Sequence, residues 1–302
     1  MFPKFRGILS PVVTPFKDDL SPDPKRFVEH CQWLVSQNAG LAVFGTNSEA
    51  NSLSVSERRF LLEALLLAGV SPEKMMPGTG CCSLTDTVEL TRHAVAAGCA
   101  GVLMLPPFYY KAISDDGLFR FYSEVIQRTG SGNLRIYLYH IPPVAQISIT
   151  AGLIERLLKE YPGTIAGIKD SSGDWNNTEM LLKNFQPSGF DVFCGSDVFL
   201  LQTLRGGGAG CITATGNVNP AMIHELYRNW QAPDADARQA RVTAIRRTFE
   251  MIPLIASMKA VIGWKRNHPQ WANVRPPLLK APREQFEQLC VKLNEIGFQM
   301  NL

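Results

Sequence analysis

Short apolar segments alternate with longer amphipathic segments along most of the chain. The apolar segments are nearly continuous in hydrophobic residues, a pattern typical of parallel strands covered by helices. Eight of them precede residue 220, at residues 7–13, 40–45, 74–80, 101–106, 135–141, 164–169, 190–195 and 210–215. The repeated order of strand and helix predicts an α/β fold with a parallel sheet.

The segments between these strands carry helix signals. Residues 54–68 begin with Ser54 and have Glu57 three positions later, which is the pattern of a capping box. Similar amphipathic segments occupy residues 23–37, 83–98, 114–128, 150–161, 175–185 and 198–207.

The strand-like segments stop at about residue 220. Residues 220–230, 237–267 and 282–297 all have helical patterns. Eight strands alternating with helices predict a (β/α)₈ TIM barrel at residues 1–220, with a small C-terminal helical region at 221–302 packed on it. A doubly wound sheet is the alternative, but no GxGxxG turn follows the first strand.

Composition limits the classes of partner. The 302 residues are 45% hydrophobic and 19% charged, which allows a large core. The 30 Lys and Arg exceed the 27 Asp and Glu by three and form no basic run, so nucleic acid is not expected. No secretory signal or membrane-spanning run is visible, and the seven cysteines are scattered, so we expect a cytoplasmic protein with reduced thiols.

Polar residues gather where the predicted strands end. In a (β/α)₈ barrel, the active site lies at the C-terminal ends of the strands. The polar stretches at these ends are GTNSEA (45–50), PPFYYK (106–111), YHIPP (139–143), KDSSG (169–173), GSD (195–197) and TATGN (213–217).

One of these ends carries a lysine that calls for an explanation. Lys169 closes an apolar strand, and a lysine in such a place usually has a partner or a function. Alternation along neighbouring strands puts Tyr139 and Lys169 on faces that point into the mouth of the barrel. The small residues Ala166 and Gly167 are expected to leave room beside the lysine.

This pair suggests a reaction. A partly desolvated lysine amine can be neutral and condense with a ketone to form a Schiff base, which stabilises a neighbouring carbanion. A tyrosine can move the proton, and a Thr or Asn on a glycine turn can bind an adjacent carboxylate. The residues therefore predict a Schiff-base aldolase or lyase that acts on a 2-oxo acid. The five histidines form no HxH or HxxxH pair, so we expect no metal.

Five successive blocks of the chain resemble a known family. GTNSEANSLSVSER, LPPFYYKAISDDGLFRFY, YLYHIPP, GIKDSSG and CGSD are similar, in order, to motifs of the dihydrodipicolinate synthase and N-acetylneuraminate lyase superfamily. The resemblance covers roughly residues 5–300. It implies a (β/α)₈ barrel, class I chemistry on pyruvate or a related 2-oxo acid without a cofactor, and a homotetramer built from tight dimers.

The resemblance also implies roles for individual residues. Lys169 would form the Schiff base, Tyr139 would transfer the proton, and Thr46 would belong to the proton relay and contact the substrate. Tyr109 would reach across the tight dimer into the neighbouring site, and Tyr110 competes with it for this role.

The substrate-binding residues follow in the same way. Asn47 would lie at the turn that binds the carboxylate of the 2-oxo acid, and Gly195 and Ile212 would line the pocket. Val144 stands where the lysine-pathway synthase has an arginine that binds the carboxylate of its aldehyde substrate. An apolar side chain cannot replace a bidentate cation, which argues against synthesis of dihydrodipicolinate. Val198 stands where sialic acid lyases carry an acidic residue.

Two other functions stay open. A sugar-acid dehydratase or hydratase-aldolase would use the same enamine, and the sequence does not separate it from an aldolase. A non-catalytic protein that binds a 2-oxo acid is the alternative of another class, although the presence of Lys169, Tyr139 and Thr46 argues against it.

Overall fold

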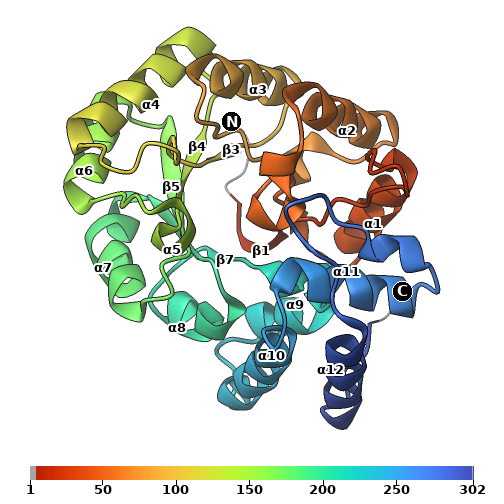
Figure 1. Cartoon of the computed structure of the whole chain (residues 1–302). Helices are drawn as coiled ribbons and strands as arrows, with labels where there is room; N and C mark the ends of the chain where they lie inside the picture. Colours follow the sequence, from red (N-terminus) through yellow and green to blue (C-terminus); the bar gives the residue numbers. More distant parts are fainter. Residues whose placement is uncertain (1–4, 301) are drawn as a thin grey trace. The chain divides into compact units, whose positions relative to one another are not determined.

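The structure is a computed structural model that describes residues 5–300 and residue 302. The chain divides into two compact units. The first contains Ser71–Cys211 and the segment that ends at Arg6, and the second contains Gly7–Val70 and Ile212–Leu302. Parallel strands alternate with helices, so the chain has the α/β fold of the (β/α)₈ barrel class, as the sequence predicts (Figure 1).

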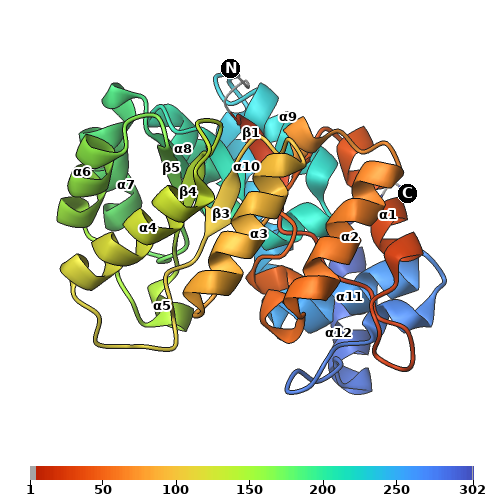
Figure 2. The same cartoon turned by 90° about the horizontal axis from the view of Figure 1, so that it is seen from above.

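The first unit carries a run of parallel strands in sequence order. Its strands are β3 (Val102–Met104), β4 (Ile136–His140), β5 (Ile165–Asp170), β6 (Asp191–Cys194) and the first two residues of β7 (Gly210–Ile212), and each pairs with the next. Helices alternate with them, namely α3 (Leu84–Ala96), α4 (Asp115–Thr129), α5 (Pro142–Ala145), α6 (Ala151–Glu160), α7 (Trp175–Phe185) and α8 (Leu200–Arg205). Helices α3 and α4 lie side by side (Figure 2).

Side-chain caps begin the helices where the sequence has a serine or threonine. Ser83 accepts a hydrogen bond from an N–H in the first turn of α3, Ser114 does the same for α4, and Thr150 for α6. Helix α4 then ends at Gly130, whose φ of 64° is the left-handed conformation that glycine adopts most easily. The caps thus agree with the sequence pattern.

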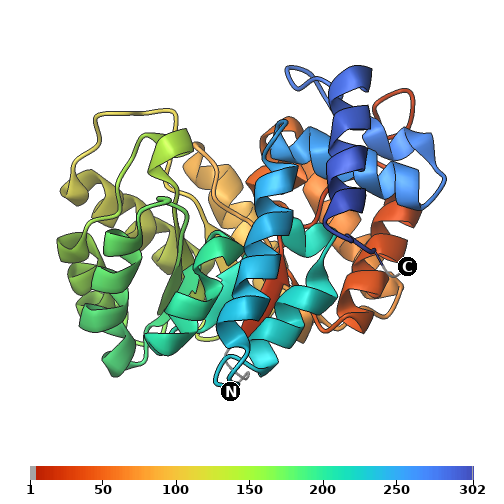
Figure 3. The same ribbon diagram turned by 90° about the horizontal axis from the view of Figure 1, so that it is seen from below.

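The second unit holds the remaining strands and the C-terminal helices. Strand β1 (Gly7–Ser10) pairs in parallel with β2 (Gly40–Leu41), and Thr213 donates its N–H to Leu9 O in β1. Its helices are α1 (Pro24–Ser36), α2 (Val55–Leu67), α9 (Pro220–Arg228), α10 (Ala235–Phe249), α11 (Leu254–Lys265) and α12 (Arg283–Glu295). The predicted capping box at the start of α2 is present. Helices α10, α11 and α12 pack on one another (Figure 3).

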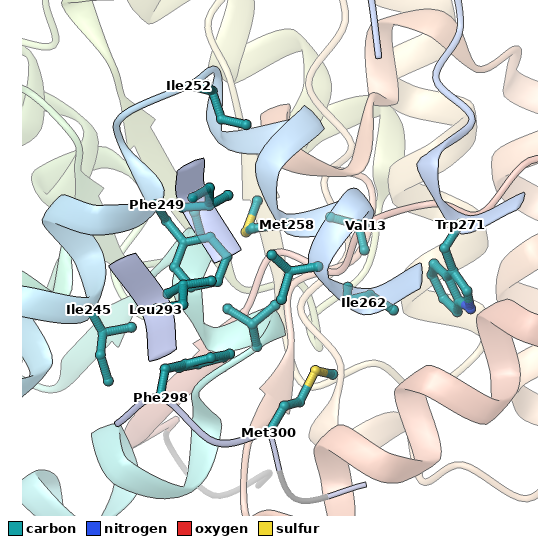
Figure 4. Close-up of a cluster of buried hydrophobic side chains, with 14 residues drawn as sticks. Val13, Ile245, Phe249, Ile252, Met258, Ile262, Trp271, Leu293, Phe298 and Met300 are labelled. Carbon is teal, nitrogen blue, oxygen red and sulfur yellow. The ribbon is translucent and has the colours of Figure 1, made fainter. Parts of the chain in front are cut away.

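A buried apolar cluster joins the C-terminal helices to the residues that follow β1 and β7 (Figure 4). Val13 and Ala214 belong to this cluster, and so do Phe249 of α10 and Leu293 of α12. The rings of Phe249 and Phe298 meet edge to face with their centroids 5.5 Å apart. The C-terminal helices therefore share one core with barrel residues of the second unit.

Two predicted segments differ from the structure. Residues 74–80 are too briefly paired to count as a strand, although Gly78 forms an isolated parallel bridge with Leu103, in which Thr79 N–H donates to Leu103 O and Leu103 N–H donates to Pro77 O. The predicted helical stretch 237–267 is two helices, since Pro253 precedes α11 and cannot continue a helix. Among the residues that the structure describes, no helix is long and apolar enough to span a membrane.

Candidate active site

Lys169 and Tyr139 lie directly opposite each other on β5 and β4 of the first unit. Lys169 Nζ donates a hydrogen bond to Tyr139 Oη at 3.2 Å and lies 4.2 Å from the centroid of the tyrosine ring. Each residue is only 2% exposed. The period-two alternation of the strands thus brings together the two residues that the sequence singles out.

The surroundings of Lys169 are unusual for a buried lysine. A buried ammonium is ordinarily paired with a carboxylate. Within the described part of the chain, Lys169 has the Tyr139 hydroxyl and ring as its direct contacts and forms no ion pair with a carboxylate. Among the described residues, its nitrogen is therefore not engaged by an acidic side chain.

The backbone on either side of Lys169 is held firmly. The side chain of the next residue, Asp170, accepts hydrogen bonds from Thr178 Oγ1 at 2.6 Å and from the N–H of Ser172 at 3.0 Å. The main-chain oxygen of Asp170 accepts the N–H of Gly195 at 2.6 Å. These bonds fix the end of β5, so the backbone that carries the Lys169 side chain is rigid.

Gly195 is needed for the close approach of the segment after β6. A Cβ at this position would lie 2.0 Å from Ser171 Oγ and 2.9 Å from Asp170 O. No side chain larger than hydrogen fits there without displacement. Gly195 therefore lies against the residues that follow Lys169, as expected for a residue of the same strand-end region.

The expectation that Gly167 leaves room beside Lys169 is wrong. A Cβ at residue 167 would lie 2.3 Å from Asp191 O and 2.9 Å from a ring carbon of Tyr137. The space is already filled by the backbone of β6 and by a neighbouring aromatic ring. Gly167 is thus a packing requirement of the sheet, and it opens no pocket.

Two exposed tyrosines stand on the loop after β3. Tyr109 is 75% exposed and Tyr110 is 62% exposed, and their rings meet edge to face with centroids 5.5 Å apart. The N–H of Tyr109 donates to Cys82 Sγ at 3.3 Å. Either tyrosine therefore has the exposure that a residue reaching a second subunit requires.

The loop with the two tyrosines is tied to the loop after β4. Lys111 Nζ donates to Phe108 O at 2.6 Å and to Ala145 O, in α5, at 3.2 Å. Val144 lies in the same short helix and is 60% exposed. The sequence analysis missed Lys111, because its partners are main-chain carbonyl groups, which no sequence motif identifies.

His140 fixes the other end of the loop that carries Val144. Its Nδ1 accepts the N–H of Ile149 at 3.0 Å, so this nitrogen carries no proton. Burial lowers the pKa of His140 below its ordinary value, and the Asp170 carboxylate acts in the opposite direction. The histidine has a structural role here, in line with its position facing away from Lys169 along β4.

The other predicted substrate residues belong to the second unit. Thr46 and Asn47 form a 3₁₀ turn with Ser48 and are half-buried. The N–H groups of Ser48 and Glu49 are used inside this turn, on Gly45 O and Thr46 O. The N–H of Asn47 takes no part in these bonds of the turn. Ile212, the last residue of β7, is fully buried.

A second buried lysine escaped the sequence analysis. Lys259 in α11 is flanked by apolar residues on both sides, which is the same signal that marks Lys169. Its side chain is fully buried and forms an ion pair with Glu49 at 2.5 Å. Lys169 is therefore buried without a carboxylate partner among the described residues, whereas the buried Lys259 is paired with Glu49.

The fold and the lysine–tyrosine pair define the class as a (β/α)₈ barrel with a strand-end amine, and comparison with known proteins gives the family. Residues 4–296 match the Dihydrodipicolinate synthetase family, and the chain belongs to this family. It is accordingly an enzyme of the lyase and aldolase type that this family comprises.

Three known proteins show the extent of the similarity. The chain is 34% identical over 287 residues to an uncharacterized DapA-like lyase of Chloroflexus aurantiacus, with 94% of each chain covered. It is 28% identical over 305 residues to the probable 2-dehydro-3-deoxy-D-pentonate aldolase YjhH of Escherichia coli, covering 97% and 98% of the two chains. The crystal structure of YagE from E. coli K12 in complex with pyruvate superimposes with a TM-score of 0.88 at 25% identity, over 98% of this chain and 99% of that one.

Proposed function

We propose that the protein is a class I aldolase in which Lys169 forms a Schiff base with pyruvate or a related 2-oxo acid. The observation that carries this proposal is the buried Lys169 amine, which has a tyrosine hydroxyl at 3.2 Å and no carboxylate partner among the described residues. Membership of a lyase family and a pyruvate complex of a structural neighbour support it.

The proposed reaction balances without any external oxidant or reductant. The Lys169 amine attacks the ketone carbon of the 2-oxo acid, and the carbinolamine loses water to leave an iminium ion. Transfer of a proton from the adjacent carbon, assisted by Tyr139, gives an enamine. The enamine carbon bonds to the carbonyl carbon of an aldehyde, whose oxygen takes up a proton. Water then hydrolyses the iminium and frees the amine, and the reverse sequence cleaves the same bond.

Each remaining residue has a place in this proposal. The turn with Thr46 and Asn47 binds the carboxylate of the 2-oxo acid, and Thr46 also takes part in the proton relay. The iminium accepts the electrons of the broken bond, so the chemistry needs neither a metal nor an organic cofactor. Tyr109 contacts the site of a second subunit in the tight dimer of a homotetramer.

The second substrate is proposed to lack a carboxylate at the end that reaches Val144. This side chain is apolar and 60% exposed, and it offers no charge to an acidic group. An aldehyde that ends in hydroxyl groups or carbon suits such a neighbour better than the aldehyde of the lysine pathway. The similarity to a probable 2-dehydro-3-deoxy-D-pentonate aldolase supports 2-dehydro-3-deoxy sugar acids as the class of substrate.

The amine chemistry is tested by trapping the Schiff base. Wild type and Lys169→Ala are incubated with pyruvate and borohydride, and the intact masses are compared. The proposal expects a reduced adduct on wild type only. The absence of an adduct with pyruvate, 2-oxoglutarate and 2-dehydro-3-deoxy sugar acids would contradict it.

The reaction type is tested by product analysis. Wild type is incubated with 2-dehydro-3-deoxy sugar acids, and released pyruvate is measured with lactate dehydrogenase. Aldol cleavage yields pyruvate and an aldehyde in equal amounts. A product that has lost water and kept its carbon chain would show a dehydratase instead, while an adduct without turnover of any compound would show a binding protein.

A further inference from the structure

The ion pair between Glu49 and Lys259 joins the turn after β2 to a C-terminal helix. Lys259 Nζ lies 2.5 Å from Glu49 Oε1, and both side chains are fully buried. The other carboxylate oxygen, Glu49 Oε2, accepts the N–H of Arg275 at 3.0 Å. Both oxygens of one buried carboxylate are thus bound by residues from the last fifty positions of the chain.

Glu49 directly follows the 3₁₀ turn Thr46–Ser48, and its backbone is constrained. Its φ of 56° lies in the left-handed region, which is uncommon for a residue other than glycine. The N–H of Glu49 donates to Thr46 O at 3.1 Å. A strained residue of this kind persists only where its surroundings hold it, and here its side chain is held by the ion pair.

The rest of the turn is anchored by a separate set of bonds. Ser48 Oγ accepts the N–H of Gly45 at 3.2 Å, and Ser48 O accepts the hydroxyl of Thr14 at 2.7 Å. These bonds restrain Ser48 from the side of β1. At Glu49, the main-chain oxygen accepts the N–H of Ser52 at 2.9 Å, and the side chain binds Lys259 and Arg275.

Stability alone does not account for a buried ion pair at this position. A buried ion pair is often no more stabilising than well-packed apolar side chains of the same size, whereas removal of one partner is strongly destabilising. Burial lowers the pKa of Lys259 from 10.5 to about 8, and the Glu49 carboxylate opposes this. The ammonium also lies 4.4 Å from the centroid of the Phe16 ring. The ion pair fixes the orientation of the Glu49 side chain, which an apolar contact would not do.

We propose that Lys259, acting through Glu49, is a positioning residue for the turn Thr46–Ser48, and that it sets the affinity of the site for the carboxylate of the 2-oxo acid. The inference rests on the proposed function, which assigns carboxylate binding to this turn. Lys259 lies in α11 and binds Glu49, which directly follows the turn, so we expect its effect to fall on substrate affinity and to spare the amine chemistry of Lys169.

The test separates positioning from folding by a pair of variants. Lys259→Met alone leaves Glu49 buried without its cation, and it is expected to lower stability. The double variant Glu49→Gln with Lys259→Met removes both charges, keeps an oxygen that can accept the N–H of Arg275, and is expected to recover stability. Lys292→Met is the matched control, because Lys292 forms an exposed ion pair with Glu295 on α12.

The measured quantities are the pyruvate concentration that gives half-maximal borohydride-trapped adduct, the maximal adduct, and the thermal unfolding midpoint. For the double variant, we expect the half-maximal concentration to rise about tenfold or more, while the maximal adduct stays at the wild-type level. Lys292→Met is expected to match wild type in all three quantities.

Failure of the positioning role and failure of the proposed function give different results. A stable double variant with the wild-type half-maximal concentration would overturn the positioning role and leave the proposed function intact. A wild-type protein that forms no adduct with pyruvate or 2-oxoglutarate would overturn the proposed function, and this inference with it.

Discussion

The substitution Tyr139→Phe removes one oxygen atom from the buried pair and leaves the rest of the site in place. Tyr139 Oη accepts a hydrogen bond from Lys169 Nζ at 3.2 Å, and the ring centroid lies 4.2 Å from the same nitrogen. Phenylalanine keeps the ring and its contact with the amine. The variant therefore loses the hydroxyl alone.

The expected magnitudes for stability and for rate differ widely. Loss of this buried hydrogen bond lowers the free energy of unfolding by about 0.5–3 kcal/mol, which a folded domain with about 5–15 kcal/mol can withstand. Loss of a proton-transferring group slows the reaction by about 10²- to 10⁴-fold. We expect a folded Tyr139→Phe protein that still forms the trapped adduct but has lost nearly all proton transfer.

The assay needs pyruvate alone, so it does not depend on the identity of the aldehyde. In deuterated water, each cycle of enamine formation exchanges a methyl proton of pyruvate, and the exchange can be followed by NMR. The rate is compared for wild type, Tyr139→Phe and the control Tyr137→Phe. Tyr137 lies two positions earlier in β4, is buried, and donates its hydroxyl to Asp191 Oδ2 at 3.3 Å.

The control makes the outcome decisive. Tyr137→Phe is expected to lose similar stability and to keep the wild-type exchange rate, because its hydroxyl bonds to Asp191 and not to Lys169. Exchange by Tyr139→Phe within about threefold of wild type would refute the assignment of proton transfer to Tyr139. Equal loss in both variants would show that the effect comes from packing.

Two further predictions concern Gly195 and Glu57. Gly195→Ala would place a Cβ 2.0 Å from Ser171 Oγ, so we expect a loss of about 1–3 kcal/mol in unfolding free energy and reduced adduct formation. Urea unfolding and trapping check this, with Gly132→Ala as a control that has nothing within 4 Å and is expected to match wild type. Hydrogen bonds from Arg275 hold the pKa of Glu57 below its ordinary value of 4.5. The stability from this pair is present above pH 4.5 and is lost as the pH falls through the lowered pKa, so unfolding curves of wild type and Glu57→Gln should converge in acid; a gap that persists there would contradict the prediction.

The strand-end pair could be predicted from the sequence because it depends on local geometry. Tyr139 and Lys169 lie on consecutive strands, and the period-two alternation of parallel strands decides which side chains share a face. The same reasoning predicts the order of strands and helices. It fails at residues 74–80, where the structure has an isolated bridge between Gly78 and Leu103 in place of the predicted strand.

The partner of Glu49 could not be predicted in this way. Glu49 and Lys259 are 210 positions apart, and no alternation rule connects a turn to a helix at such a separation. A lone lysine in an apolar segment has the same sequence signal at residues 169 and 259. Only the position of a carboxylate separates them. In the same way, the sequence shows that residue 167 is a glycine, but it does not show that the main-chain oxygen of Asp191 fills the space beside it.

The location of the trapped adduct tests the central claim most directly. Wild-type protein is reduced with borohydride in the presence of pyruvate and digested, and the modified lysine is identified by tandem mass spectrometry. We expect the modification on Lys169 and an unmodified Lys259, whose amine is held by Glu49. Modification of Lys259, or of exposed lysines with Lys169 unmodified, would contradict the assignment of Lys169 as the Schiff-base residue.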